Sequence, residues 1–136
     1  MRLTNNFSLI EFLESEFYTT QQQRDVYADF IKNMDEYLPR IQKLANNLQV
    51  LRDKIGKPIS INIAFRPTWY ELSKGRSGKS QHTLCKAADI HVKGVKTKYI
   101  HETIEDLIDK GEMLQGGLGY YPNFIHYDIR KAKARW

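Results

Sequence analysis

Three short segments with alternating polar and apolar residues constrain the fold of this chain more than any other feature. They are SINIAF (60–65), AADIHV (87–92) and FIHYDIR (124–130). Because successive side chains of a β-strand point to opposite faces, each segment has one apolar face that a helix can cover. The opposite faces carry ionisable residues, among them Asp89, His126 and Asp128. The pattern predicts a sheet with one covered face and one polar face.

The regions outside these segments have helical periodicity. Apolar residues recur at three- and four-residue steps from about position 21 to 55. Pro39 lacks the amide hydrogen that a helix interior requires, so we expect two helices that meet near Tyr37–Pro39. A third helix is expected over Lys98–Lys110.

The order of these elements predicts the fold class. Helices come first, then strands, one more helix, and finally the segment GGLGYY (116–121), a short strand or turn that leads into the last strand. This order favours an α+β fold with a small, mainly antiparallel sheet packed by helices. With 136 residues and no internal repeat, the chain is expected to form a single domain over 1–136.

Composition excludes several classes of protein. The apolar fraction of 41% and the charged fraction of 27% are typical of a globular chain. No apolar run approaches the roughly 20 residues of a membrane helix, so no membrane insertion is expected. The first residues lack the apolar core of a signal peptide, so we expect no self-directed secretion. A single cysteine excludes an internal disulfide.

The positive charge favours a polyanionic partner. The net charge of +5 suits nucleic acid, acidic lipid or an anionic cell wall. Four of the basic residues lie in the C-terminal segment RKAKARW, which is either a solvated tail or a region that attracts substrate. Nucleic acid is the weaker choice, because the aromatic residues occupy core-like positions instead of alternating with lysines on one surface.

A metal site is the chemistry that the polar strand faces favour. His82, Asp89 and His126 offer two imidazoles and a carboxylate, and catalytic zinc typically takes three such ligands and one water. The alternative is that each histidine is structural. His91 shares a strand face with Asp89, so it either reaches the site or is solvated. Cys85 is either a soft metal ligand or, the stronger interpretation, a buried structural thiol.

Two motifs resemble those of a known family. SQHTLCKAADIHV (80–92) and GGLGYYPNFIHYDIR (116–130) are similar to the zinc D-alanyl-D-alanine carboxypeptidases and related peptidoglycan endopeptidases, in particular the small single-domain, phage endolysin-like branch. The matching positions are Ser80, His82, Ala87 and Asp89 in the first motif, Gly117, Gly119, Tyr120, Tyr121 and His126 in the second, and the pair Arg66–Pro67. The resemblance implies the hedgehog / D-Ala-D-Ala peptidase-like fold, with zinc on the polar face of the sheet.

The resemblance also implies a role for each matching residue. His82, Asp89 and His126 would bind Zn²⁺, which would activate the attacking water. Arg66 would hold the substrate's carbonyl or carboxylate and stabilise the oxyanion. Ser80 would support the loop of the first ligand and, together with Tyr121, line the substrate site.

Two positions depart from the family pattern. Cys85 replaces a glycine, so this residue is expected to be strained in a left-handed conformation or to adopt another turn. Asn123 stands where many members carry the acidic general base. Asp128 follows His126 by two residues, so it could replace the base or orient a ligand; alternatively it forms a salt bridge to Arg66 or Arg130.

The sequence therefore predicts a zinc metallopeptidase that hydrolyses peptidoglycan stem peptides or cross-links. The alternative is a catalytically weakened cell-wall-binding or phage structural domain that retains the peptidase fold. We expect a monomer that is made in the cytoplasm and acts on the cell wall, as a phage endolysin or virion component, with a peptidoglycan peptide as partner and no nucleic acid.

Overall fold

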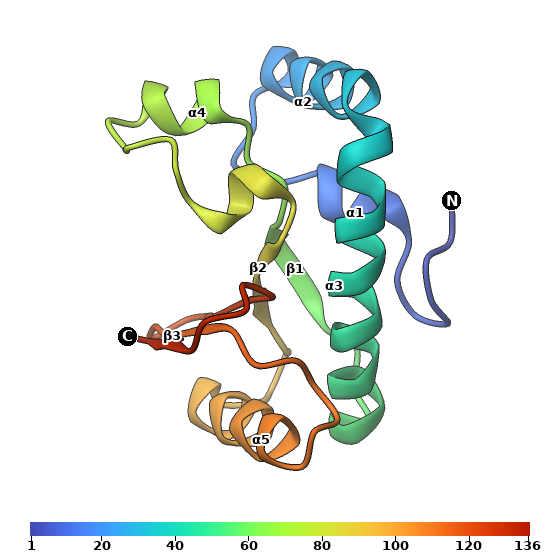
Figure 1. Cartoon of the computed structure of the whole chain (residues 1–136), viewed down its shortest axis with the longest axis vertical. Coiled ribbons are helices and arrows are strands. Elements are labelled where there is room, and N and C mark those ends of the chain that lie inside the picture. The colour runs from blue at the N-terminus through green and yellow to red at the C-terminus, as the bar shows by residue number, and fades with distance from the viewer.

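A five-stranded sheet lies at the centre of the computed structural model, which describes all residues 1–136. Figure 1 shows its position among the helices. Its strands are β1 (Ser60–Ile63), β2 (Ala87–His91), β3 (Gly117–Tyr120), β4 (Ile125–Asp128) and β5 (Ala134–Arg135), in the spatial order β1-β2-β4-β3-β5. Neighbouring strands are antiparallel except for the parallel pair β3–β5. The predicted α+β class with a mainly antiparallel sheet is confirmed.

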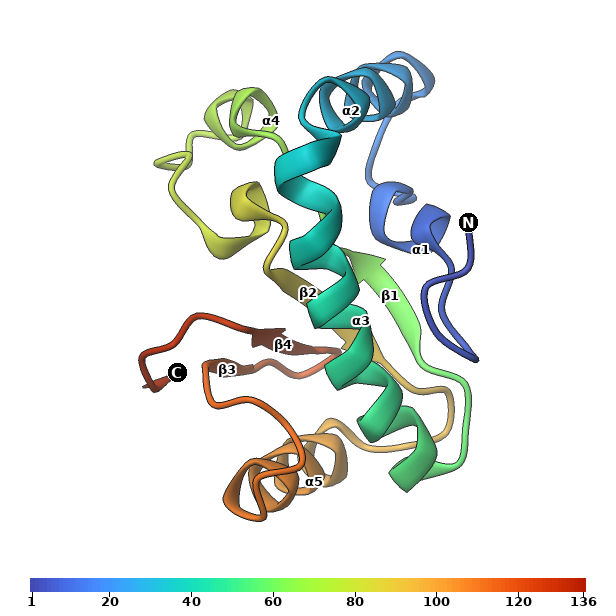
Figure 2. The ribbon, with the colours of Figure 1, turned by 45° about the vertical axis from the view of Figure 1, so that its right-hand side comes forward.

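Helices surround this sheet on one face and at both ends. They are α1 (Leu9–Leu13), α2 (Thr20–Lys32), α3 (Met34–Ile55), α4 (Thr68–Ser73), the 3₁₀ turn η1 (Gln81–Leu84) and α5 (Thr97–Asp109). The long helix α3 crosses one face of the sheet, with α2 and α4 at one end of the molecule and α5 at the other (Figures 1 and 2). None of the helices combines the length and the apolar character needed to cross a bilayer.

The first two long helices meet at a different residue from the one expected. The junction is Asn33, and the predicted break near Tyr37–Pro39 is wrong. Asn33 leaves helical geometry with φ −115° and ψ 22°, and its side-chain amide donates to the Asp29 carbonyl at 2.9 Å. Pro39 lies near the start of α3, where its missing amide removes only one helical hydrogen bond, the one to the Asp35 carbonyl. The predicted third helix is confirmed to within one residue at each end.

The apolar face of the sheet packs against α3. Leu44 and Leu48 of α3 are completely buried, as are Ala88 of β2 and Tyr127 of β4. The Tyr127 hydroxyl also donates to the Leu114 carbonyl at 2.8 Å, which satisfies its polar end within the core. Since Tyr127 faces α3, its strand neighbour His126 projects from the opposite face. The alternation predicted from the sequence thus separates the core from the polar face.

The C-terminal residues form part of the sheet. Ala134 and Arg135 form β5, which pairs with β3, and the Trp136 carbonyl accepts a hydrogen bond from the Tyr120 amide at 2.8 Å. The Arg135 guanidinium forms two hydrogen bonds of 2.9 and 2.8 Å to Glu105 on α5. The solvated-tail interpretation is therefore wrong for residues 134–136. Sequence patterns did not mark β5 because it has only two residues.

Candidate metal centre

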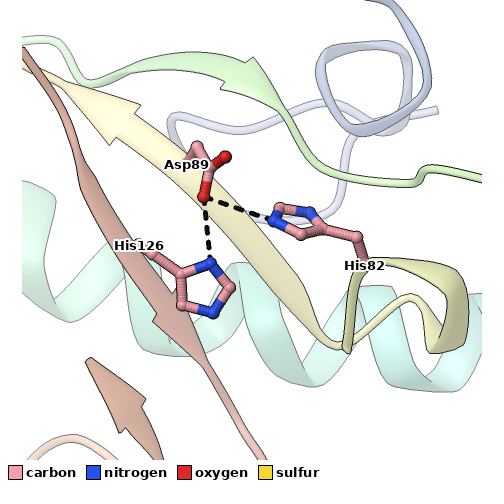
Figure 3. A group of neighbouring side chains, drawn as sticks. All are labelled: His82, Asp89 and His126. Carbon is pink, nitrogen blue, oxygen red and sulfur yellow. Dashed lines mark hydrogen bonds and ion pairs between the residues drawn. The ribbon is translucent and has the colours of Figure 1, made fainter. Parts of the chain in front are cut away.

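The polar face of the sheet brings His82, Asp89 and His126 together (Figure 3). His82 comes from η1, Asp89 from β2 and His126 from β4, and Asp89 lies directly opposite His126 in the antiparallel register. One nitrogen or oxygen atom from each residue lies within 4.8 Å of the other two, and all three residues are buried. These are the three residues that the sequence predicted as metal ligands.

His82 is fixed by a backbone carbonyl. Its Nδ1 lies 2.7 Å from the Ala64 oxygen, and because a carbonyl can only accept, Nδ1 carries the hydrogen. The other ring nitrogen, Nε2, therefore presents a lone pair, and it lies 3.3 Å from Asp89 Oδ1. Burial lowers the pKa of His82 more than the neighbouring Asp89 raises it, which keeps the ring neutral.

His126 is fixed in the same way by a carboxylate. Its Nε2 lies 2.7 Å from Asp128 Oδ2 and donates to it, so Nδ1 presents the lone pair, 3.0 Å from Asp89 Oδ1. Burial opposes a charge on this ring, but the protonated ring can donate to both Asp128 and Asp89, and these carboxylates outweigh burial and raise the pKa of His126. Figure 3 shows both rings directed at the same oxygen of Asp89.

The donor set fits a zinc ion. Two imidazole lone pairs and one carboxylate oxygen converge whenever His126 is neutral; no hydrogen then lies between them, so their negative ends repel one another. Burial would raise the pKa of Asp89, but the two neighbouring histidines outweigh burial and lower it, so the group stays ionised. Two nitrogens and one oxygen are ligands that zinc prefers, and a divalent cation between them removes the repulsion.

Asp128 is saturated with hydrogen bonds behind His126. This fully buried carboxylate accepts from the backbone amides of Gly117 at 2.9 Å and Arg130 at 3.1 Å, and from the Arg130 guanidinium at 2.9 and 2.7 Å. A Cβ at position 117 would lie 2.2 Å from this carboxylate, so glycine is required there. Asp128 does not line the pocket over the metal centre. The geometry therefore favours a positioning role over that of a replacement base.

A pocket of about 430 Å³ opens over the three candidate ligands. Its other lining residues are Arg66, Arg76, Lys79, Ser80, Gln81, Tyr121, Phe124, Arg130 and Trp136. Ser80 and Tyr121, which the sequence placed at the substrate site, thus both line this pocket. Among the lining side chains, that of Asp89 is the only carboxylate.

Arg66 lies at the edge of the pocket in the loop that follows β1, because the strand ends at Ile63. Its Nε donates to Glu71 Oε2 at 2.9 Å, while its two terminal amino groups have no partner within the protein. Glu71 is 1% exposed and also accepts a hydrogen bond from the Ser80 hydroxyl. The sequence did not identify Glu71, because it lies on the six-residue helix α4, which is too short to show a clear period.

Aromatic side chains also line the pocket. The Trp136 indole lies 5.0 Å from the His126 ring and donates from Nε1 to the Tyr121 hydroxyl at 2.7 Å. Tyr121 in turn stacks on Phe124 at 4.4 Å. A Cβ at Gly119 would lie 2.6 Å from the indole nitrogen, so this glycine makes room for the tryptophan. Sequence reasoning missed Trp136, because only the pairing of β5 brings it to the site.

Three further candidates lie outside the metal centre. Asn123, at the position of the expected base, is exposed and does not line the pocket. His91 bonds instead to the Asn62 side chain on β1. Cys85 is buried, and burial raises the pKa of its thiol, which stays protonated. With φ 61°, Cys85 adopts the left-handed conformation expected where the family has glycine.

Comparison with known proteins agrees with this geometry. No curated protein and no solved structure matched the chain. The family model "Peptidase M15" matches residues 11–128, which include all three candidate ligands and Arg66. Peptidases of this family are zinc-dependent. Since the match covers nearly the whole chain, this protein belongs to the peptidase M15 family.

Proposed function

We propose that this protein is a zinc metallopeptidase that hydrolyses peptide bonds in peptidoglycan stem peptides or cross-links. The observation that carries the proposal is the convergence of His82 Nε2, Asp89 Oδ1 and His126 Nδ1 beneath a pocket that Arg66 lines. A zinc ion bound there supplies a Lewis acid that lowers the pKa of water and polarises a carbonyl. Buried partners fix the tautomer of each histidine before any metal arrives.

Arg66 is the group suited to stabilise negative charge on the substrate. Glu71 holds its Nε, which orients the guanidinium and leaves the terminal amino groups for a carbonyl oxygen or carboxylate. Its side chain is 14% exposed, so such hydrogen bonds form in partly desolvated surroundings, where they are stronger than in water. The planar fork matches a carboxylate or a developing oxyanion.

The absence of a second carboxylate side chain among the pocket residues favours an alternative function. Asn123 is exposed and Asp128 is saturated, so neither is poised to accept a proton from water. A general base typically contributes about 10²- to 10⁴-fold to the rate. A protein without one is either a slow enzyme or a wall-binding or phage structural domain that retains the fold.

Digestion of purified sacculi by the zinc-loaded protein tests the two functions. We expect muropeptide fragments cut within stem peptides or cross-links, identified by mass spectrometry, and no fragments from a His82→Ala protein. The variant Asn123→Asp tests whether a base at this position raises the rate, and Asp128→Asn tests the role of the buried carboxylate. If fully loaded parent and Asn123→Asp proteins release nothing yet bind sacculi, the binding-domain alternative is correct.

We propose further that the protein acts as a monomer on the cell wall. It would be made in the cytoplasm and reach the wall as a phage endolysin or virion component. Its net charge of +5 supports attraction to an anionic wall. Light scattering would measure its mass, and retention on sacculi and on DNA across a salt series would distinguish the wall from nucleic acid as partner.

A further inference from the structure

Two basic residues at the pocket rim have no acidic partner. Arg76 and Lys79 lie on the segment 74–80 between α4 and η1, and both line the pocket. Both are exposed, and neither forms a salt bridge. The other two arginines of the pocket, Arg66 and Arg130, are paired with Glu71 and Asp128. Arg76 and Lys79 therefore present cationic groups that are available to a ligand.

The segment that carries Arg76 and Lys79 is held by hydrogen bonds to Glu71, which also holds Arg66 in the pocket. The Arg76 amide donates to the Glu71 carbonyl at 3.0 Å, and the Ser80 hydroxyl donates to the Glu71 carboxylate. Glu71 thus anchors both ends of the segment and also holds Arg66. Gly78, at φ +75°, packs against α4, where an added Cβ would lie 3.0 Å from a Thr68 methyl group. The two cations are displayed from an anchored loop.

The charge of the surface changes from the pocket to the hollows that adjoin it. A neighbouring hollow shares Arg66, Arg76, Asp89 and Phe124 with the pocket and extends to Asn62. A third hollow, of about 580 Å³, begins at Asn62 and contains Glu11, Glu14 and Glu16. The three hollows are linked in series by shared lining residues and form a groove. This groove is basic over the metal centre and the middle hollow, where Lys74 joins Arg66 and Arg76, and acidic at its far end. A carboxylate is attracted to the basic part and repelled from the acidic end.

We propose that Arg76 and Lys79 form a subsite for a carboxylate of the peptide substrate, close to the scissile bond. The inference rests on the proposed peptidase function and names a feature of its substrate. The carboxylate is either the C-terminal group of the peptide or the side chain of an acidic residue beside the scissile bond. Its binding would place the rest of the peptide along the groove, towards the acidic end.

Three synthetic stem peptides of one sequence test the subsite. The first has a free C-terminus and a free acidic side chain, the second is amidated at the C-terminus, and the third is amidated at the side chain. With the zinc-loaded parent protein we expect kcat/KM to fall about tenfold for one amidated peptide, and the peptide affected identifies the source of the carboxylate. In the double variant Arg76→Gln/Lys79→Gln this preference should disappear, mainly through a higher KM for the free peptide.

The matched control is Lys57→Gln/Lys93→Gln. It removes the same charge from two exposed lysines that line none of the three hollows, so it should retain the preference. Equal hydrolysis of all three peptides by the parent, or an unchanged preference in the Arg76/Lys79 variant, would overturn the subsite but leave the peptidase proposal standing.

Binding measurements distinguish a failure of the peptidase proposal from a failure of the subsite proposal. If the parent cleaves none of the peptides, the peptidase proposal fails, and calorimetric titration with the same peptides tests the subsite directly. Tighter binding of the free peptide that is lost in the Arg76/Lys79 variant would support the subsite. Equal affinities for all three peptides would refute it.

Discussion

The two histidines of the candidate metal centre are held by acceptors of different charge. On the η1 side, His82 donates to the neutral carbonyl of Ala64; on the β4 side, His126 donates to the carboxylate of Asp128, itself paired with Arg130. The pKa of His82 is lowered by burial, whereas that of His126 is raised by its carboxylate partners. Both acceptors fix a tautomer, but the charged carboxylate raises the basicity of its imidazole more, which makes His126 the stronger metal ligand.

Removal of either histidine should have the largest effect on zinc binding. We expect His82→Ala and His126→Ala each to abolish stoichiometric zinc, because only two of the three protein ligands remain. The matched control is His91→Ala, which should keep one zinc per chain, since His91 bonds to Asn62 outside the centre. Elemental analysis of the dialysed proteins measures the zinc. A full equivalent in His82→Ala, or its loss in His91→Ala, would show that the ligand set is wrong.

Arg66→Lys should lower the catalytic rate but keep the backbone hydrogen bond through which Arg66 supports His82. The Arg66 backbone amide donates to the His82 carbonyl at 3.2 Å, and this hydrogen bond survives the substitution. Zinc content and unfolding temperature should therefore hold. Lysine cannot reproduce the planar fork, so kcat/KM should fall about 10²-fold, as for the loss of an oxyanion donor. Unchanged turnover on sacculi would exclude the proposed role of the guanidinium.

Asp128→Asn tests whether the negative charge of the acceptor behind His126 raises zinc affinity. The amide can still accept from His126 but carries no charge, so zinc affinity should fall about 10- to 100-fold. Competition with a chromogenic chelator measures this affinity. Asp109→Asn, an exposed residue at the end of α5, is the control. Equal affinities in parent and Asp128→Asn proteins would mean that the charge behind His126 does not matter.

The effect of pH on apo-protein stability and on zinc affinity should be smaller than the effects of these substitutions, and it should depend on His126. The pKa of His126 is raised in the folded state, so its protonation stabilises the apo protein. This stabilisation is fully present below the ordinary histidine pKa of about 6.5 and is lost as the pH rises through the pKa of the folded state. Zinc requires the neutral ring, so zinc affinity should rise over the same interval. Thermal unfolding of apo protein and chelator competition, each between about pH 6 and 9, measure the two trends.

The same pH series in Asp128→Asn checks the assignment. Without the carboxylate, the pKa of His126 loses its main upward contribution, so both trends should move to lower pH. His82 has a lowered pKa and stays neutral throughout, so it should not contribute. Trends that persist unchanged in Asp128→Asn would assign the titration to another group.

The candidate metal centre was predictable from sequence to the extent that it depends on strand alternation and local motifs. Asp89 and His126 were expected on polar strand faces, and the register of β2 with β4 places them opposite each other. The left-handed conformation of Cys85 was expected as one alternative, because glycine stands there in the family. Such features depend on residues near one another in the chain.

The remaining features depend on tertiary contacts that no local pattern encodes. Glu71 reaches Arg66 and Ser80 from a helix of only six residues. Helix α3 continues through Pro39 because its packing outweighs the one helical hydrogen bond lost there. Tertiary context decided these cases over intrinsic propensity.

The position of Trp136 provides an intrinsic optical reporter. The chain has two tryptophans, and Trp69 lies on α4 outside the pocket that Trp136 lines. Replacement of Trp69 by phenylalanine would leave a single indole emitter, 5.0 Å from the His126 ring and 5.4 Å from the Arg130 guanidinium. Emission from that ring should respond to the charge state of His126 and to any molecule that displaces water from the aromatic side chains of the pocket. Metal uptake and peptide entry could then be followed by fluorescence in real time, without an added label.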